Sequence, residues 1–275
     1  MHPRGYARRI GNINVSFSRI TQRINPTAIV KPPPFRIKAY GPEAVLLEWP
    51  EAVSEDILTD VLGFADYLRE HCLKDAAWEL VPIYHSLLLF KGSKIDLEPF
   101  SRSLKKWFEQ YPGPSQRTVQ DWVLPVCYDP EFGPDLEDVA ERLEIDTEEV
   151  IRRHCAQAYR VYGIGFLPGF LYLGGVPANL EVPRKENPRL KVARGSVGLA
   201  SQQTGIYPQE SPGGWNLIGR CPIPLFDPTR QPPCFIAQGD TVRFRPVSEA
   251  EFNLHRIEAE VGVYDFKKKY GHAKG

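Results

Sequence analysis

Short runs of apolar residues, each about as long as a β-strand, dominate the hydrophobic pattern of the first third of the chain. Four of them lie at 35–40, 44–49, 77–82 and 83–90. The turn-forming pair Gly41-Pro42 separates the first two runs and predicts a hairpin. The last two runs predict a second pair of strands, in which His85 alternates with apolar neighbours and is interpreted as structural.

Two longer segments carry apolar residues at the spacing of a helix. In the first, over 57–68, they recur every three or four residues, and Ser54 provides an N-cap. The second segment, over 99–108, places its apolar residues on one face. This order of strand pairs and helices predicts a small α+β sandwich over residues 35–111, an open sheet with helices on one side.

A stretch rich in proline and glycine, Tyr111-Pro-Gly-Pro-Ser115, marks the expected domain boundary. Beyond it, the pattern predicts a strand over 119–128 and a helix over 135–143. A second helix begins at Asp146, a good N-cap residue, and carries His154 near its end.

From residue 159 to residue 246 the chain consists of short β-prone runs between glycines and prolines. The clearest runs are 159–165, 192–199, 215–219 and 241–244. Many short strands with dense turn signals predict a β-barrel or sandwich, here a second domain over residues 117–247. Residues 248–275 are expected to form a C-terminal tail.

Composition limits the class of protein. Hydrophobic residues make up 42% of the chain and charged residues 25%, as in an ordinary soluble globular protein. No run approaches the roughly 18 apolar residues of a membrane span. The five cysteines are scattered, without CxxC or zinc spacing, so we expect free thiols, a cytoplasmic location and no metal site.

The net charge of zero hides an uneven distribution. Residues 1–34 hold six basic residues and no acidic one, which leaves 28 basic against 34 acidic residues in the remainder. A mildly acidic body gives no reason to expect nucleic-acid binding. The basic leader is interpreted as a disordered arm or as the product of a start codon set too far upstream, with a transit peptide as the alternative.

The familiar catalytic signatures are absent. The sequence contains no GxxxxGK[ST], GxSxG or HExxH, and the glycine-rich stretch at Gly163 has Pro168 at the position where a dinucleotide-binding motif needs its third glycine. Three glycine-rich stretches, at 163–175, 195–198 and 211–215, are nevertheless unusual. Each is either a turn between barrel strands or a place where a ligand approaches the backbone closely.

We predict that these three stretches share a binding groove. The groove is expected to consist of Gly165, Phe166, Pro168, Gly169, Phe170, Gly195, Ser196, Gln203, Thr204, Tyr207, Ser211, Gly213, Gly214 and Trp215. Three further residues are the catalytic candidates: Arg220, His154 and Arg194.

The catalytic candidates have structural alternatives. Arg220 lies in an apolar strand and needs a partner, which is either a ligand or a core carboxylate such as Asp227 or Asp240. His154 is either a general acid or base or a histidine stabilised by the end of its helix. Arg194, with Arg184 and Arg189, either holds a phosphate or carboxylate or belongs to a solvated loop.

A series of motifs between residues 35 and 246 resembles the KipI/allophanate hydrolase subunit 1 family. The longest is Gly165-Phe-Leu-Pro-Gly-Phe-Leu-Tyr-Leu-Gly-Gly175. The others are Val81-Pro-Ile-Tyr-His-Ser-Leu-Leu-Leu89, Phe132-Gly-Pro-Asp-Leu136, Pro188-Arg189, Gly195-Ser-Val-Gly198, Gln203-Thr-Gly-Ile-Tyr-Pro208, Ser211-Pro-Gly-Gly-Trp215, Leu217-Ile-Gly-Arg220, Leu225-Phe-Asp-Pro228 and Gly239-Asp240.

The resemblance implies an N-terminal α+β domain followed by a cyclophilin-like β-barrel. It also implies one component of an ATP-dependent 5-oxoprolinase, inactive alone, that converts 5-oxo-L-proline to L-glutamate. The implied partners are an allophanate hydrolase subunit 2 (KipA-type) protein and a LamB/YcsF-type protein. The implied cofactor is ATP with Mg, bound by this chain or only in the complex.

Two alternatives within the family stay open. One is an inhibitor that binds a sensor histidine kinase. The other is the carboxyltransferase half of a urea carboxylase/allophanate hydrolase system. A cyclophilin-like fold does not itself imply prolyl isomerase activity, because function follows the site rather than the fold.

Overall fold

The computed structural model describes residues 33–50 and 53–265 of the chain. Most of the predicted basic leader, residues 1–32, and the end of the predicted tail lie outside the described residues. None of the helices within the described ranges is long and apolar enough to cross a membrane.

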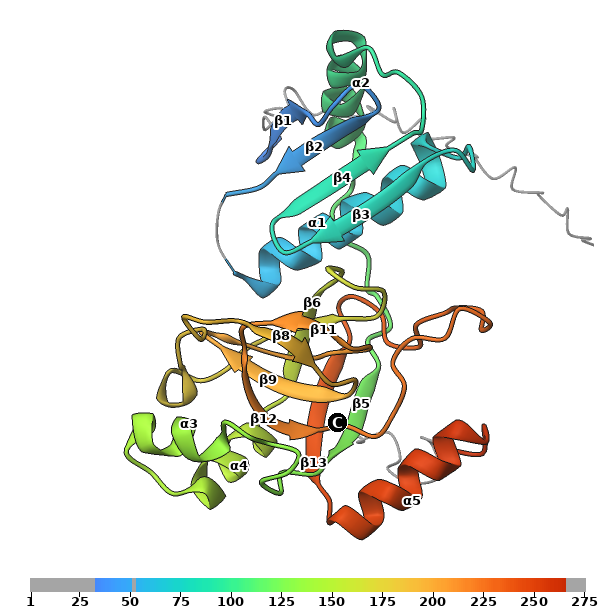
Figure 1. Cartoon of the computed structure of the whole chain (residues 1–275). Helices are drawn as coiled ribbons and strands as arrows, with labels where there is room; N and C mark the ends of the chain where they lie inside the picture. Colours follow the sequence, from blue (N-terminus) through green and yellow to red (C-terminus); the bar gives the residue numbers. More distant parts are fainter. Residues whose placement is uncertain (1–32, 51–52, 266–275) are drawn as a thin grey trace, which may run out of the picture. The chain divides into compact units, whose positions relative to one another are not determined.

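The N-terminal part is a four-stranded antiparallel sheet with two helices, as predicted (Figure 1). Its strands are β1 (Arg36–Ala39), β2 (Ala44–Glu48), β3 (Glu79–Ile83) and β4 (Ser86–Phe90), in the order β1-β2-β4-β3. Helix α1 (Glu55–Tyr67) continues into a π-helical turn η1 (Leu68–Cys72), and α2 (Leu97–Gln110) follows β4. Alternate strand residues such as Val45, Leu47 and Leu87 are buried with residues from both helices, so the helices cover one face of the sheet.

The turn of the second hairpin lies later than the sequence predicted. Tyr84 and His85 form it, with Tyr84 in the left-handed region at φ 51°, and His85 is therefore in a turn rather than in a strand. The prediction ended the first strand at Pro82. That proline lies within β3, opposite Leu87, and β3 is at the edge of the sheet, where a residue without an N–H is tolerated.

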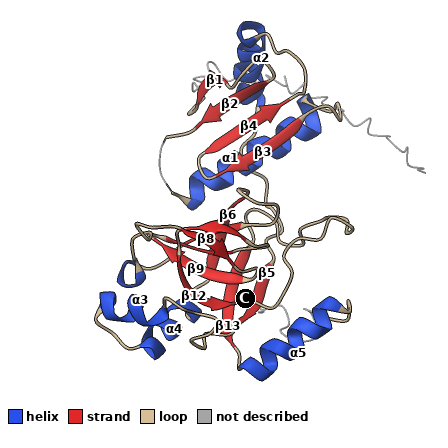
Figure 2. Ribbon diagram, viewed as in Figure 1, coloured by secondary structure: helices blue, strands red, loops and turns tan. Residues whose placement is uncertain are grey.

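The second part is a seven-stranded, barrel-like sheet, which confirms the predicted fold class (Figures 1 and 2). In spatial order its strands are β12 (Asn216–Arg220), β9 (Ser196–Ala200), β10 (Gln203–Ile206), β7 (Leu171–Gly174), β6 (Tyr159–Ile164), β13 (Thr241–Pro246) and β5 (Asp121–Val126). The two outer strands meet just beyond β5, because Cys127 and Arg220 exchange backbone hydrogen bonds of 2.9 and 2.8 Å. This contact nearly closes the sheet.

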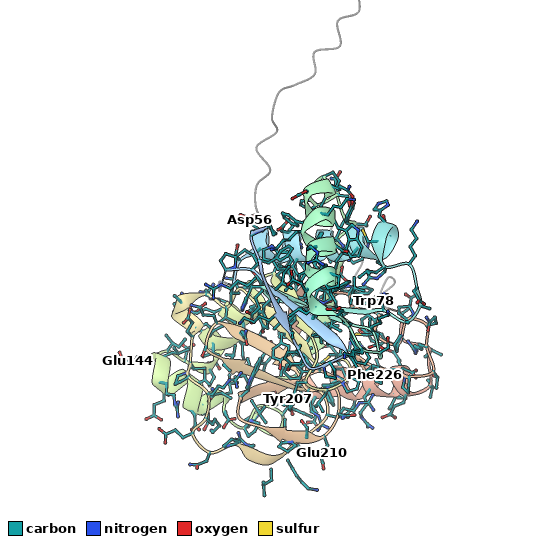
Figure 3. The ribbon with its side chains drawn as sticks, turned by 90° about the horizontal axis from the view of Figure 1, so that it is seen from above. Asp56, Trp78, Glu144, Tyr207, Glu210 and Phe226 are labelled. Carbon is teal, nitrogen blue, oxygen red and sulfur yellow. The ribbon has the colours of Figure 1, made fainter. Side chains whose placement is uncertain are left out.

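Smaller elements surround the barrel. They are α3 (Leu136–Leu143), α4 (Thr147–Cys155), the 3-10 turn η2 (Ala178–Leu180), the two-stranded sheet of β8 (Arg189–Val192) and β11 (Ser211–Gly213), and α5 (Glu249–Glu260). The predicted cap of α4 is present, since the Asp146 side chain accepts a hydrogen bond from the Glu149 N–H. Branched aliphatic residues fill the barrel, and a separate aromatic cluster contains Phe170, Trp215 and Tyr207, the last of which is labelled in Figure 3.

A buried carboxylate, Asp135, joins three segments beside α3. Its Oδ1 accepts hydrogen bonds from Lys185 Nζ at 2.5 Å and Arg189 Nη2 at 2.6 Å, and its Oδ2 accepts one from the Leu217 N–H at 2.7 Å. Burial alone would raise its pKa, but these hydrogen bonds outweigh burial and hold the pKa below 3.8. Arg189, one of the arginines considered for ligand binding, is thus engaged by the protein itself.

Helix α5 is the main element that the sequence analysis did not predict. It begins inside the segment expected to be a tail, with a capping box in which Ser248 and Glu251 bond each other's backbone N–H groups. Phe252 and His255 are buried, while Leu254 and Ile257 are about half exposed. Because apolar residues occur on both faces, the helical period is weak, and the capping box was the usable signal.

Candidate functional site

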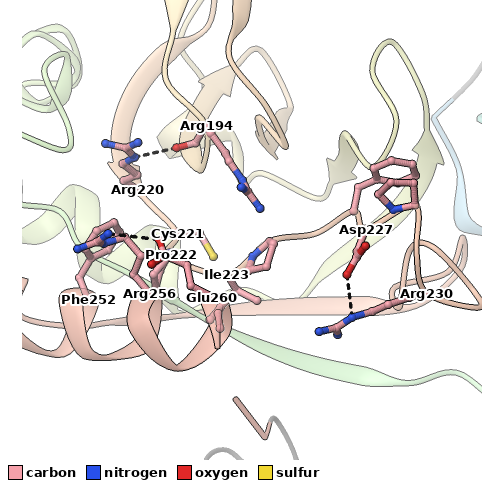
Figure 4. A pocket seen from close by; sticks show the side chains of 14 residues that line it. Arg194, Arg220, Cys221, Pro222, Ile223, Asp227, Arg230, Phe252, Arg256 and Glu260 are labelled. Carbon is pink, nitrogen blue, oxygen red and sulfur yellow. Dashed lines mark hydrogen bonds and ion pairs between the residues drawn. The ribbon is translucent and has the colours of Figure 1, made fainter. Parts of the chain in front are cut away.

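A cavity of about 550 Å³ lies beside the point where the barrel nearly closes (Figure 4). Three segments form its wall: the turn before β9, the chain from the end of β12 to Arg230, and α5. Its volume is within the range of small-molecule sites. Two of the three catalytic candidates, Arg194 and Arg220, line it.

The ionisable lining of the cavity is mainly basic. The basic residues are Arg194, Arg220, Arg230 and Arg256, and the acidic residues are Asp227 and Glu260. Arg230 Nε pairs with Asp227 Oδ2 at 3.1 Å, and Arg256 Nη1 pairs with Glu260 Oε1 at 3.2 Å. Four guanidinium groups against two carboxylates leave a net charge of about +2 at neutral pH.

Arg220 is held by a backbone carbonyl rather than by a carboxylate. Its Nε donates to the Arg194 carbonyl oxygen at 2.7 Å. Burial lowers the pKa of its guanidinium, and the nearby Arg256 lowers it further, although the group remains a cation at neutral pH. The lowered pKa indicates a positive charge that its surroundings do not fully compensate.

The proposed core partners of Arg220, Asp227 and Asp240, are engaged elsewhere, so that interpretation is wrong. Asp227 accepts hydrogen bonds from Thr229 and Arg230. Asp240 accepts from the Trp122 ring N–H at 2.9 Å and from two backbone N–H groups, which fixes the start of β13.

The turn before β9 sets the position of Arg194. Gly195 has φ +83°, and a Cβ there would lie 2.2 Å from the carbonyl oxygen of Cys221. Its N–H bonds to the Tyr207 carbonyl at 2.7 Å, and its carbonyl accepts from the Cys221 N–H at 2.8 Å. Only glycine permits this close approach, which brings the Arg194 backbone to the end of β12.

The Gly165–Gly175 stretch reaches the cavity through Phe226. Gly169 has φ +82°, and a Cβ there would lie 2.6 Å from the Cβ of Phe226, a lining residue. In the same loop Phe166 has φ 66° and is 64% exposed, with its ring edge-on to Phe170 at 5.7 Å. The loop therefore packs against Phe226, a residue of the cavity wall, and does not itself line the cavity.

Most other residues of the predicted groove are packed inside the protein. Phe170 contacts both Tyr207 and Trp215 edge-to-face in the buried aromatic cluster. Ser196, Thr204 and Ser211 are also buried. Gln203 donates to the Tyr84 hydroxyl at 2.6 Å.

The glycines of the third predicted stretch have similar surroundings. Gly213 lies against Tyr207, and Gly214 lies against Pro188. Of the predicted groove residues, Gly165 and Pro168 also belong to the loop behind Phe226. The structure thus brings Arg194 and Arg220 together at the cavity, whereas none of the fourteen groove residues is part of its lining.

His154 belongs to a buried chain of hydrogen bonds. Thr204 Oγ1 donates to the Gly198 carbonyl at 3.0 Å, so it accepts from His154 Nε2, also at 3.0 Å. The Tyr128 hydroxyl therefore donates to Nδ1, at 2.7 Å. A neutral imidazole satisfies every bond, and burial lowers the pKa of His154 from 6.5 to about 3. The ring is fully buried and lies outside the cavity, so the geometry favours a structural role.

We expect His154 to make the protein less stable in acid. The unfolded chain gains the histidine proton near pH 6.5, whereas the folded chain gains it only near pH 3. The free energy of unfolding should therefore fall as pH drops through this window, by about 5 kcal/mol in total from this group. Urea denaturation at several pH values checks this. A His154→Gln variant should lose this component, and a parallel profile for the two proteins would contradict the assignment.

The sequence analysis missed the lining residues contributed by α5 and by the preceding segment. Phe252, Arg256 and Glu260 come from α5, and Arg230 comes from the loop after Asp227. The spacing of four residues between the members of the α5 set puts them on one helix face. That spacing and the Ser248–Glu251 capping box are visible in the sequence once a helix is considered.

The mainly basic lining of the cavity is suited to binding an anion. Burial raises the pKa of the lining thiol, Cys221, to about 12, which makes it a poor nucleophile. Hydrogen bonds from Thr229 lower the pKa of Asp227, so this carboxylate is ionised. Within the described part of the chain, there is no group of three or more His, Cys, Asp or Glu residues arranged to hold a metal ion.

Comparison with known proteins identifies relatives of this chain. The family model described as carboxyltransferase domain, subdomain C and D, matches residues 35–236. A 5-oxoprolinase subunit of Bacillus subtilis (strain 168) is 34% identical over 236 residues, which cover 82% of this chain and 98% of that protein. The protein of the same name from Haemophilus influenzae is 42% identical over 168 residues, covering 60% of this chain and 78% of that protein.

Solved structures share the fold. The crystal structure of TTHA0988 superposes with a TM-score of 0.64 at 34% identity, covering 78% of this chain. The urea carboxylase of Kluyveromyces lactis superposes with a TM-score of 0.67 at 19% identity, covering 84% of this chain. This chain spans 40% of the first of these chains and 23% of the second.

Proposed function

We propose that this chain is a subunit of an ATP-dependent 5-oxoprolinase, the one that corresponds to the relatives named above. The chain belongs to the carboxyltransferase subdomain C and D family and is of the KipI/allophanate hydrolase subunit 1 type. The complex would convert 5-oxo-L-proline to L-glutamate with hydrolysis of ATP. The names of the relatives support the role of a subunit. The structural observation that carries the proposal is the cavity with four guanidinium groups, two carboxylates and an unreactive thiol.

Such a cavity suits one half of a divided active site. A lactam is a poor electrophile, and transfer of the γ-phosphoryl group of ATP to its oxygen makes the ring carbon susceptible to water. In the balanced reaction, 5-oxoproline, ATP and two water molecules give glutamate, ADP and phosphate. Guanidinium groups such as those of Arg194 and Arg220 can neutralise the phosphates and the substrate carboxylate. The remaining acid–base groups would then come from partner subunits.

The partners and the cofactor follow from the same proposal. An allophanate hydrolase subunit 2 (KipA-type) protein and a LamB/YcsF-type protein would complete the complex. ATP would bind with Mg, and the Mg would be held by the phosphates and by groups outside this cavity, whose two carboxylates already pair with arginines. A cytoplasmic location remains a prediction.

Co-expression of this chain with the two partners tests the proposal. We expect the purified complex to hydrolyse ATP only when 5-oxoproline is present and to form glutamate and phosphate in equal amounts. This chain alone should show no such activity. A stable complex of all three proteins without 5-oxoproline-dependent ATP hydrolysis would overturn the assignment.

A second candidate is the carboxyltransferase half of a urea-metabolising system. Urea amidolyase of Lachancea kluyveri is 30% identical over 135 residues, which cover 46% of this chain and 7% of that protein. The alternative predicts transfer of a carboxyl group from carboxybiotin to urea by the complex with the subunit 2 protein. Measuring that transfer beside the 5-oxoproline reaction distinguishes the two.

A further inference from the structure

We propose that the cavity binds a phosphate group through guanidinium groups of its lining and that α5 supplies one of them, Arg256. Arg194 and Arg220 line the same cavity, and their guanidinium groups extend to opposite sides of the hydrogen bond that joins Arg220 to the Arg194 carbonyl (Figure 4). This inference deepens the proposed function, on which it rests only for the identification of the phosphate as part of ATP.

Ion pairing leaves the two candidate arginines uncompensated. Asp227 is occupied by Arg230, and Glu260 is occupied by Arg256. Among the residues described, Arg220 makes its side-chain hydrogen bond from Nε to the Arg194 carbonyl, and its two Nη groups are not engaged. The Arg194 guanidinium has no hydrogen bond or ion pair with any described residue. Two guanidinium groups therefore present free donors at the cavity.

The surroundings of Arg220 favour an anion between the guanidinium groups. Burial and Arg256 both lower the pKa of Arg220, and the influence that raises it comes from Glu131, an exposed residue outside the lining. Like charges in a partly buried site repel each other, and a bound anion removes that repulsion. A bound anion would thus offset the unfavourable effect of Arg256 on the charge of Arg220.

The charge of the site fits a phosphate better than a carboxylate. The lining carries about +2 in total, which a phosphate close to a dianion balances and a single carboxylate does not. A guanidinium presents paired N–H groups that match two phosphate oxygens. The volume of about 550 Å³ leaves room for a group attached to the phosphate.

Helix α5 holds Arg256 firmly enough to act as a ligand. The Ser248–Glu251 capping box fixes the start of the helix. Phe252 is 5% exposed and anchors the helix, because its ring centroid lies 4.6 Å from that of Phe132. Arg256 follows Phe252 by four residues, so both lie on the face toward the cavity. Glu260, one turn further on, pairs with Arg256 and would compete with a bound anion.

Two variants of the same ion pair give opposite predictions. Titrations of the full-length chain with inorganic phosphate and with pyrophosphate, followed by calorimetry at low salt, measure the affinity. Arg256→Gln and Arg220→Gln should each weaken binding about tenfold or more. Glu260→Gln removes the same pair as Arg256→Gln but should strengthen binding several-fold. Arg142→Gln, on the exposed surface of α3, should leave the affinity unchanged and serves as the charge-matched control.

The outcomes separate this inference from the proposed function. Equal affinities for Arg256→Gln, Glu260→Gln and the unaltered chain would overturn the role of α5. Absence of phosphate and pyrophosphate binding in both the chain and the three-protein complex would overturn the site. A complex that lacks 5-oxoproline-dependent ATP hydrolysis but still binds phosphate through Arg256 would refute the proposed function while the site stands. An active complex whose KM for ATP is unchanged by Arg256→Gln would refute the phosphate site, while the proposed function would stand.

Discussion

Replacing Asp135 by alanine is expected to lower the free energy of unfolding by about 3–5 kcal/mol, because it removes the common partner of two cations. The carboxylate is 1% exposed and binds Lys185, Arg189 and the backbone N–H of Leu217. Alanine would leave the N–H of Leu217 and the two side chains without their acceptor. Urea denaturation monitored by circular dichroism at neutral pH measures the loss.

Asp138 provides a matched control for Asp135. It lies in the first turn of α3, three residues after Asp135, which is the N-cap residue of that helix, and it faces the same Lys185 at 3.5 Å, but its side chain is 58% exposed. Asp138→Ala should therefore cost less than about 1 kcal/mol. The contribution of Asp135 should also disappear in acid, because its lowered pKa stabilises the fold above pH 3.8 and this stabilisation is lost as pH falls further. Equal losses for the two alanine variants at neutral pH would contradict the role of burial.

The sequence predicted the fold well where one local rule decided the structure. The Gly41-Pro42 turn, the apolar period of α1 and the Asp146 cap each act over a few residues, and each element appears where it was expected. The second hairpin turn was misplaced because proline usually ends a strand, and only the neighbouring strands determine that Pro82 lies at an edge. The resemblance to a known family supplied the barrel, which local periodicity alone left open as a barrel or sandwich.

The site was only partly predictable because long-range contacts form it. Arg220 could be singled out, since an arginine among Leu217 and Ile218 requires a polar partner. The glycine-rich stretches were ambiguous, because glycine serves equally for a ligand and for another part of the chain. At Gly195 the approaching group is the Cys221 backbone. Arg256 could not be placed from sequence, because only the folded barrel brings α5 beside the end of β12.

Arg220→Gln is expected to have the largest effect on activity. In the complex of the three proposed subunits, we expect the kcat/KM for 5-oxoproline-dependent ATP hydrolysis to fall about 100-fold or more, because a fixed cation near the transferred phosphoryl group is lost. The fold should survive, because Arg220 closes the barrel through its backbone bonds with Cys127, which glutamine can also make. Steady-state kinetics, with thermal unfolding as a check, measure both effects.

Lysine at the same position separates charge from geometry. Arg220→Lys keeps a cation but loses the fork of N–H groups and the Nε donor that bonds the Arg194 carbonyl at 2.7 Å. If paired hydrogen bonds to the phosphate matter, Arg220→Lys should recover only part of the lost activity. If charge alone matters, lysine should restore most of it. A glutamine variant that folds, assembles with its partners and keeps full activity would remove Arg220 from the mechanism, and with it the reason to place the phosphate beside the end of β12.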